Sequence, residues 1–151
     1  MACGWGFAHL YEFRDADGES IAGHETLKEE SNIPTAASIK LKSFFKQPGQ
    51  ECLYVYDFGD NWEHWVKFVG KVSLPERFVQ RLVGGEGMFP PDDCGGIMGY
   101  EDCVKACRLT PAQIKKLDPD EREDLLARKD WMGQWRPEGF DFKKVQEDFA
   151  R

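Results

Sequence analysis

Residues 51–69 read ECLYVYDFGDNWEHWVKFV, and this stretch decides the fold class. Two runs rich in aromatic and β-branched residues flank Gly59-Asp60-Asn61, which is a turn sequence. In the second run Trp62, His64, Val66 and Phe68 alternate with other residues, so they share one face of a strand. The stretch therefore predicts an antiparallel hairpin. We expect an α+β domain with an antiparallel β-sheet centred on residues 51–69 and covered by helices.

The flanking sequence predicts one more strand and several helices. FAHLYEF, from Phe7 to Phe13, precedes turn residues at 15–18 and reads as a strand. Helical spacing predicts a short helix before Pro48-Gly49, a helix over 100–108, a helix from Pro111 broken near Pro119, and a last helix carrying Phe142, Val145 and Phe149. Residues 83–99, VGGEGMFPPDDCGGIMG, are too rich in Gly and Pro for regular structure and predict an ordered or functional loop.

Length and charge narrow the class of protein. The chain has 151 residues, the usual size of one domain, so residues 1–151 are expected to form a single domain. Its formal net charge of −7 opposes phosphate neutralisation, so nucleic acid is not an expected partner. It has no apolar run of membrane-spanning length and no signal-peptide pattern at its start, which predicts a cytoplasmic protein without membrane contact. Five cysteines, an odd number, fit reduced thiols.

Three unusual strings occur in order along the chain. They are YDFGDNWEH at 56–64, GGEG at 84–87 and PPDDCGGIMGYED at 90–102, supported by HLYEF at 9–13 and FD at 140–141. Together they resemble the plasmid pRiA4b ORF-3-like family over most of the chain. The resemblance implies an α+β domain of bacteria and archaea with no established biochemical activity. Some members are labelled as passenger resolvases of an insertion element. A resolvase needs a nucleophilic serine supported by arginines and a basic DNA-binding element. The sequence shows neither in a recognisable arrangement, so a role in DNA recombination ranks third.

The chain departs from the family pattern in two places. Family members usually begin earlier, with a strand and a helix that ends near the Gly-Trp found here as Gly4-Trp5. Loss of those two elements would uncover apolar surface and an unpaired sheet edge, which favours a homodimer. The family also often carries cysteine near the positions of Leu82 and Phe89, and here only Cys94 is retained from that set. This weakens a cysteine-based metal site.

Acidic residues gather at the hairpin and in the Gly/Pro-rich loop. We expect the loop to fold back toward the hairpin turn, which would bring 92–96 close to 57–64. Carboxylates gathered in this way suit a divalent cation such as Mg²⁺ or Ca²⁺. No other cofactor is predicted. The candidate binding residues are Asp57, Asp60, His64, Glu86, Asp92, Asp93 and Cys94, of which Asp60, His64 and Asp93 are the metal-ligand candidates.

A structural role for these residues is the favoured alternative. Asp60 would close the turn, and Asp92 or Asp93 would cap the helix that opens near Tyr100. His64, which alternates with apolar residues, reads as a hydrogen-bonded rim residue.

The thiols suggest two further sites, and both are weaker than core packing. Cys94, Cys103 and Cys107 lack the paired spacing of a structural zinc site, and a buried cysteine is a good small apolar residue. Cys94 precedes two glycines, but a thiol nucleophile needs a base. Nothing in the sequence places one of the three histidines beside it.

The sequence therefore favours a binding or interaction module for an unidentified protein or small ligand over an enzyme. The rival is a metal-dependent enzyme, such as a hydrolase, that uses the acidic cluster. An enzyme of that kind needs three or more of these side chains to converge on an open cleft. A binding module would instead use them as turn and cap residues.

Overall fold

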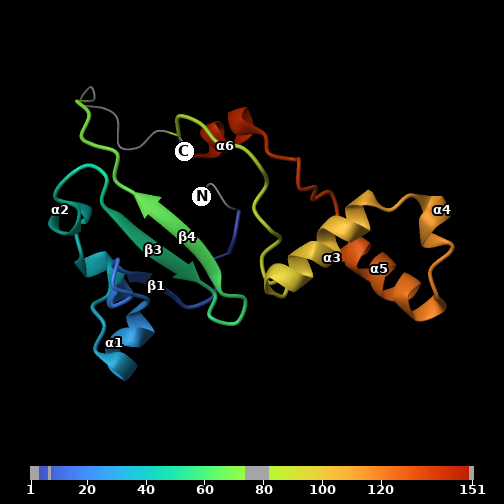
Figure 1. Cartoon of the computed structure of the whole chain (residues 1–151), viewed down its shortest axis with the longest axis horizontal. Coiled ribbons are helices and arrows are strands. Elements are labelled where there is room, and N and C mark those ends of the chain that lie inside the picture. Colours follow the sequence, from blue (N-terminus) through green and yellow to red (C-terminus); the bar gives the residue numbers. More distant parts are fainter. Residues whose placement is uncertain (1–3, 7, 74–81, 150–151) are drawn as a thin grey trace. The chain divides into compact units, whose positions relative to one another are not determined.

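The structure is a computed structural model that describes residues 4–6, 8–73 and 82–149 (Figure 1). The chain forms two compact units. We call residues 8–73 the sheet unit, and residues 4–6 together with 82–149 the helical unit. Each is described by itself, and the expectation of a single domain stays a prediction.

The sheet unit contains a four-stranded antiparallel sheet. Its strands are β1 (Tyr11–Arg14), β2 (Ser20–Gly23), β3 (Glu51–Tyr56) and β4 (Trp62–Lys67), in the order β2-β1-β3-β4. The hairpin predicted from residues 51–69 is confirmed as β3 and β4, with Leu53 opposite Trp65. The sheet and the helices confirm the α+β class.

The first hairpin was only half predicted. The strand expected over 7–13 appears as β1, which begins at Tyr11, and β2 was not predicted at all. Asp15 closes the turn between them, because its Oδ1 accepts the backbone N–H groups of Asp17 and Glu19, each at 3.0 Å. The sequence SIAG of β2 carries little β-branched or aromatic signal.

Short helices complete the sheet unit: α1 (Glu25–Ser31), the 3₁₀ turn η1 (Ala36–Ser38) and α2 (Leu41–Phe44). Helix α1 packs close to β2, since a Cβ added at Gly23 would lie 2.7 Å from Leu27 Cδ1. After α2, Phe45 is buried and stacks on Phe68, with ring centroids 5.6 Å apart. The predicted helix before Pro48-Gly49 is therefore real but only one turn long.

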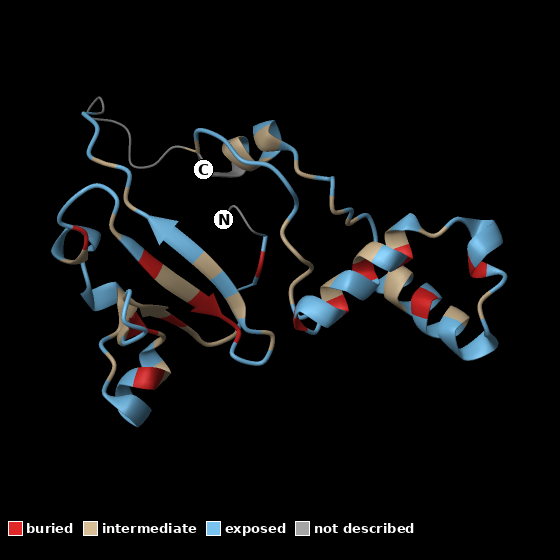
Figure 2. Cartoon of the chain, viewed as in Figure 1, coloured by how far each residue is buried: buried red, intermediate tan, exposed pale blue. Residues whose placement is uncertain are grey.

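The C-terminal end of β3 is the most deeply buried part of that strand (Figure 2). Val55 and Tyr56 are fully buried. Glu12 on β1 is buried too, and its carboxylate accepts hydrogen bonds from Arg14 and from the Ser20 hydroxyl. This buried charge is compensated within the first hairpin.

The helical unit contains α3 (Gly96–Arg108), α4 (Pro111–Ile114), α5 (Pro119–Met132) and α6 (Phe142–Phe149). The expected break near Pro119 separates α4 from α5, and each begins with a proline at its first turn. Thr110 and Gln113 form a capping box at α4, and Asp118 caps α5. None of the helices in the described ranges could span a membrane.

Helix α3 begins earlier than the sequence predicts. Residues 83–99 were expected to lack regular structure, yet the helix starts at Gly96, four residues before Tyr100. The chain turns into it through positive φ angles at Asp93 (61°), Gly95 (92°) and Gly96 (67°), which glycine adopts without strain. The glycines thus start this helix, where their abundance had indicated a loop.

The preceding stretch, residues 88–92, is a loop that accepts hydrogen bonds from residues before it and after it in the sequence. The indole Nε1 of Trp135 donates to Phe89 O, and that of Trp5 donates to Pro90 O, both at 2.8 Å. The Gly6 N–H donates to Asp92 Oδ2 at 2.8 Å. Residues from both ends of the sequence therefore fasten this loop inside the helical unit.

Candidate functional site

In the sheet unit, the predicted site residues shape the hairpin turn. Asp57 is buried, and its Oδ1 accepts the N–H groups of Gly59 at 2.9 Å and Asp60 at 3.3 Å. Its Oδ2 lies 3.4 Å from His9 Nδ1. The residue that closes the turn is thus Asp57, where Asp60 was expected. Asp57 has a φ of 56°, a left-handed conformation that aspartate tolerates better than most residues.

His64 lies half-buried on β4. Its Nδ1 is 3.4 Å from Tyr54 O, and its ring centroid lies 5.5 Å from that of Tyr54. This geometry agrees with the expectation of a hydrogen-bonded rim residue.

In the helical unit, the predicted residues do not act as helix caps. Asp92 holds the N-terminal segment through Gly6, and the N-cap of α3 is Gly95, which makes no side-chain hydrogen bond. The expectation that Asp92 or Asp93 caps this helix is therefore wrong, because glycines in left-handed conformation start it. Asp93 and Glu86 are exposed, and Cys94 is buried with its Sγ 3.8 Å from Gly96 O.

The predicted divalent cation stays a prediction, as does the approach of the loop to the hairpin turn. Asp60 and His64 belong to the sheet unit, whereas Asp93 belongs to the helical unit.

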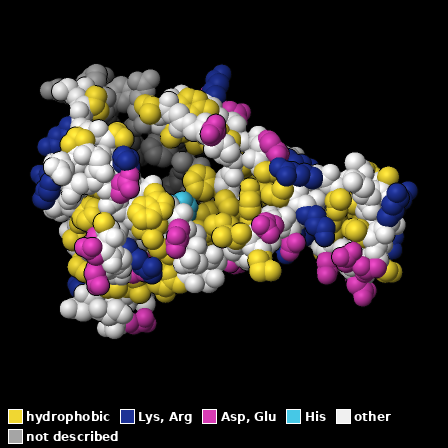
Figure 3. All heavy atoms as spheres, viewed as in Figure 1, with side chains coloured by type: hydrophobic (Ala, Val, Ile, Leu, Met, Phe, Trp, Pro, Cys, Tyr) yellow, Lys and Arg dark blue, Asp and Glu magenta, His cyan; other side chains and the backbone are white. Residues whose placement is uncertain are grey.

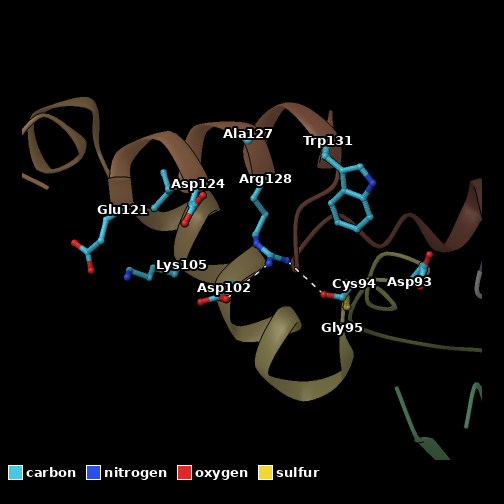
Figure 4. Close-up of a pocket in the computed structure, with 11 residues that line it drawn as sticks. Asp93, Cys94, Gly95, Asp102, Lys105, Glu121, Asp124, Ala127, Arg128 and Trp131 are labelled. Carbon is cyan, nitrogen blue, oxygen red and sulfur yellow. Dashed lines mark hydrogen bonds and ion pairs between the residues drawn. The ribbon is translucent and has the colours of Figure 1, made fainter. Parts of the chain in front are cut away.

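A groove lies between α3 and α5, within the helical unit (Figure 4). It has a volume of about 760 Å³. The loop before α3 contributes Asp93, Cys94 and Gly95; α3 contributes Asp102 and Lys105; α5 contributes Glu121, Asp124, Leu125, Ala127, Arg128 and Trp131. Two of the residues predicted from the sequence, Asp93 and Cys94, thus lie in this groove.

Arg128 ties the two walls of the groove together. Its Nη1 donates to Cys94 O and to Gly99 O, both at 3.4 Å, and Nη2 lies 3.8 Å from Asp102 Oδ2 (Figure 4). An arginine with several donors suits a set of carbonyl and carboxylate acceptors. Arg128 therefore orders the start of α3, and its charge is partly engaged by the protein itself.

The remaining lining groups include three charged side chains and one exposed ring. Glu121, Asp124 and Lys105 form no ion pair with other described residues, and the Trp131 side chain is 53% exposed. Four carboxylates and two cations line the groove, a balance of −2. Figure 3 shows charges of both signs over α4 and α5.

The three tryptophans of the described helical unit differ in role. Trp5 and Trp135 place their indole N–H groups on backbone carbonyls of the 88–92 loop, as described above. Trp131 presents its ring to the groove instead. A large exposed ring beside charged groups is typical of an interaction surface.

Most residues of this groove were not predicted from the sequence. Glu121, Asp124, Arg128 and Trp131 recur at helical spacing on α5 and define one face. That periodicity is visible in the sequence, but a charged helical face is usually only solvated. The decisive information is the packing of α3 against this face, which sequence spacing does not show.

Of the four described cysteines, Cys52, Cys94 and Cys103 are buried, which agrees with core packing. Cys103 is fully buried, and Cys107 Sγ lies 3.6 Å from Trp135 O. In the sheet unit, burial raises the pKa of the Cys52 thiol, which keeps it in the unreactive protonated form.

Comparison with known proteins identifies relatives but assigns them no activity. The chain is 34% identical over 108 residues to the uncharacterized protein y4hQ of Sinorhizobium fredii (strain NBRC 101917 / NGR234), a match that covers 70% of this chain. The match covers 54% of y4hQ, so the chain spans about half the length of this curated relative.

A solved structure has the same fold. It is the crystal structure of the protein of unknown function MM3350 from Methanosarcina mazei Go1, with a TM-score of 0.69 and 28% identity. The similarity covers 95% of this chain and 76% of that one. The family model described as plasmid pRiA4b ORF-3-like protein matches residues 1–144, nearly the whole chain. The chain therefore belongs to the plasmid pRiA4b ORF-3-like family.

Proposed function

We propose that the protein is a non-enzymatic binding module that holds a segment of a protein partner in the groove between α3 and α5. The observation that carries this proposal is the exposed ring of Trp131 in the groove. The other two tryptophans of the helical unit, Trp5 and Trp135, instead donate hydrogen bonds to backbone carbonyls. Tryptophan is enriched among the residues that dominate the binding energy of protein interfaces.

The charges of the groove favour a basic partner segment. Glu121 and Asp124 lie on the same face of α5, and neither forms an ion pair with a described residue. A lysine or arginine of the partner would complement these carboxylates, while an apolar or aromatic side chain would cover Trp131. Lys105 on α3 would add orientation by pairing with an acidic group of the same segment.

The roles of the predicted site residues support binding over metal-dependent hydrolysis. Asp57 closes a turn and Asp92 holds the N-terminal segment, so one oxygen of each carboxylate already accepts a backbone N–H group. A metal-dependent enzyme would need such carboxylates free to converge on the reacting atoms.

The test is selection of peptides from a displayed random library on the purified full chain. We expect the enriched peptides to carry a basic residue close in sequence to a bulky apolar residue. The two should be separated by no more than one helical turn, or by a few residues in an extended peptide. Trp131→Ala and Asp124→Lys should each weaken their binding at least about tenfold, because both remove central contacts. Isothermal titration calorimetry with a synthetic selected peptide measures the loss.

Two matched controls lie on the same helix outside the groove. Leu126→Ala removes an exposed apolar side chain, and Glu123→Lys makes the same charge reversal one residue before Asp124. Both variants should bind the selected peptides as the wild type does. Peptides that bind Trp131→Ala and Asp124→Lys with unchanged affinity would refute the proposal, as would a library that yields no enriched sequence.

A further inference from the structure

A second pocket lies within the sheet unit. It has a volume of about 580 Å³ and is enclosed by the first hairpin turn at 15–17, the end of α2, residues 49–51 and Trp65. The hairpin turn continues β1, and β1 and β4 flank β3 on opposite sides. The pocket therefore lies over the face of β3, inside the sheet, and not beyond the outer edge of β4.

The charged groups that line this pocket are all acidic. They are Asp15, Asp17 and Glu51. Asp15 uses Oδ1 to accept the N–H groups of Asp17 and Glu19, while its Oδ2 forms no hydrogen bond or ion pair with another described residue. The Asp17 carboxylate forms none with the described residues either. The pocket thus offers carboxylate oxygens that can accept further hydrogen bonds.

Aromatic rings complete the lining. Trp65 is 66% exposed, and Phe44 at the end of α2 is half-buried. The face of a tryptophan ring attracts a cation, and its flat surface also covers an apolar chain. A ligand that suits both the carboxylates and the rings carries a positive charge on an apolar body.

The protein's own Lys67 shows how an ammonium meets one of these carboxylates. Lys67 Nζ lies 2.6 Å from Glu51 Oε1, although Lys67 does not line the pocket. Lys67 and Trp65 are two residues apart on β4, so their side chains share a face of the sheet. One carboxylate of the pocket is therefore already paired with an ammonium, and the other two form no ion pair with a described residue.

We propose that this pocket binds an alkylammonium ion, which is a positive amino group on an apolar chain. Free diamines and lysine side chains both carry this group. The ammonium lies among the three carboxylates, and the chain packs against Trp65. Because the site belongs to the sheet unit, the proposal is independent of the function assigned to the groove between α3 and α5.

The lining favours an organic cation over a divalent metal ion. Mg²⁺ and Ca²⁺ take about six or more oxygen ligands at short distance, and rings supply none. Among the residues that the structure describes, Asp15, Asp17 and Glu51 do not bring three carboxylate oxygens within 4.8 Å of one another. An ammonium has three separate donors and does not require such close convergence.

Titration of the isotope-labelled full chain with cadaverine, followed by NMR spectroscopy, tests the site. We expect saturable shifts of the Trp65 indole N–H signal and of the backbone N–H signals of Asp17 and Glu51, while the signals of α1 stay in place. Trp65→Leu should weaken binding about fivefold or more, and Trp65→Phe, which keeps a ring, should retain most of the affinity. Methylammonium has the charge without the chain, so it should bind about fivefold more weakly or less tightly still.

Charge variants separate the pocket from general attraction to an acidic protein. Asp17→Asn removes a carboxylate of the pocket and should weaken binding about two- to fivefold. Glu19→Gln removes a neighbouring carboxylate that does not line the pocket and should leave the affinity unchanged. Lys67→Gln frees Glu51 and should strengthen binding about two- to fivefold. Lys28→Gln, an equal change of charge on α1, should not.

A lysine derivative with both ends blocked, N-acetyl-lysine methylamide, distinguishes the two sources of the ligand. Tighter binding of this compound than of cadaverine assigns the pocket to a lysine of a partner protein, and the reverse assigns it to a free diamine; either result supports the site. The proposal is overturned if neither compound shifts the Trp65 signal. It is also overturned if Trp65→Leu binds as the wild type does, or if Mg²⁺ shifts the same signals at lower concentration than either amine.

Discussion

At the scale of single residues, Gly99 is the described glycine with the least room for a side chain. A Cβ added there would lie 1.7 Å from Cys94 O and 2.7 Å from Cys94 C. The same carbonyl of Cys94, and that of Gly99, accept hydrogen bonds from Arg128. The close approach of these two residues therefore sets the position of the backbone that Arg128 binds in the groove.

Replacement of Gly99 by alanine should strongly destabilise the helical unit. The obstacle is backbone rather than a flexible side chain, so α3 must shift, and we expect a loss of at least about 2 kcal/mol in the free energy of unfolding. Urea unfolding followed by circular dichroism at 222 nm measures it. Gly84→Ala is the control, since nothing lies within 4 Å of an added Cβ there. Equal stability of the two variants would contradict the packing described for Gly99.

At this scale the sequence indicated which residues make structural hydrogen bonds, but it did not indicate which groups they bond to. The acids of the hairpin and the loop were singled out, and Asp57 and Asp92 do accept backbone hydrogen bonds. Asp92, however, binds the N–H of Gly6, 86 positions away in the chain. No local rule of turns or caps reaches a partner at that separation.

At the scale of elements, the first turn of α5 shows how a side chain next to a helix satisfies its backbone N–H groups. Asp118 precedes Pro119 and accepts the N–H groups of Glu121 at 3.0 Å and Asp120 at 3.1 Å. The hydrogen bond from the Glu121 N–H is the main cause that lowers the pKa of Asp118 below its ordinary value. The carboxylate form is thus the one that the folded helix prefers.

The contribution of this cap should depend on pH in a definite direction. Because the pKa of Asp118 is lower in the folded protein than in the unfolded chain, its stabilisation is present above the unfolded value and disappears as the pH falls through the folded value. Asp118→Ala should therefore lower the melting temperature at neutral pH, and the difference from wild type should shrink below about pH 4.

Asp118→Asn serves as the control for the cap, because asparagine also caps helices but carries no titrating charge. Its melting temperature should lie between those of the wild type and Asp118→Ala at neutral pH. A difference between wild type and Asp118→Ala that grows on acidification would contradict the assigned role.

Elements with strong local signals were predicted, and elements that depend on tertiary packing were not. β3, β4 and the break at Pro119 follow from aromatic alternation and from proline chemistry. Helix α1 and strand β2 are short, and both are stabilised where Leu27 packs on Gly23. Such contacts outweigh weak intrinsic propensity, which is why the sequence alone did not show these two elements.

At the scale of the whole molecule, the charge balance bears on the resolvase label of some family members. The chain carries 27 acidic and 20 basic residues, and the groove is net acidic. Affinity for a duplex depends mainly on cations that neutralise phosphates.

We expect the full chain not to bind a fluorescently labelled DNA duplex at about 150 mM salt, as measured by anisotropy. The same duplex with a basic DNA-binding protein provides the positive control. Saturable binding that weakens linearly in a plot of log affinity against log salt would instead show a phosphate-contacting surface, and would return a DNA role to consideration.

The organisation into two units was the least visible feature at this scale. Length and composition favour a single domain, an expectation that the division into two compact units does not test. Trp5 and Gly6 belong to the helical unit although they precede the sheet unit in the chain. Composition cannot indicate that Trp5 and Gly6 belong to the helical unit. Their residue types are ordinary, and only the positions of their hydrogen-bond partners assign them to that unit.

The fastening of residues 88–92 has a consequence for anyone who re-engineers this chain. An affinity tag, a cleavage site or a new pair of termini placed there would separate Phe89 and Pro90 from Trp135 and Trp5, despite a composition that looks permissive. The exposed tip of the first hairpin, at Asp17-Gly18, is the better point of insertion, because its backbone hydrogen bonds go only to the neighbouring Asp15 and hold no distant segment.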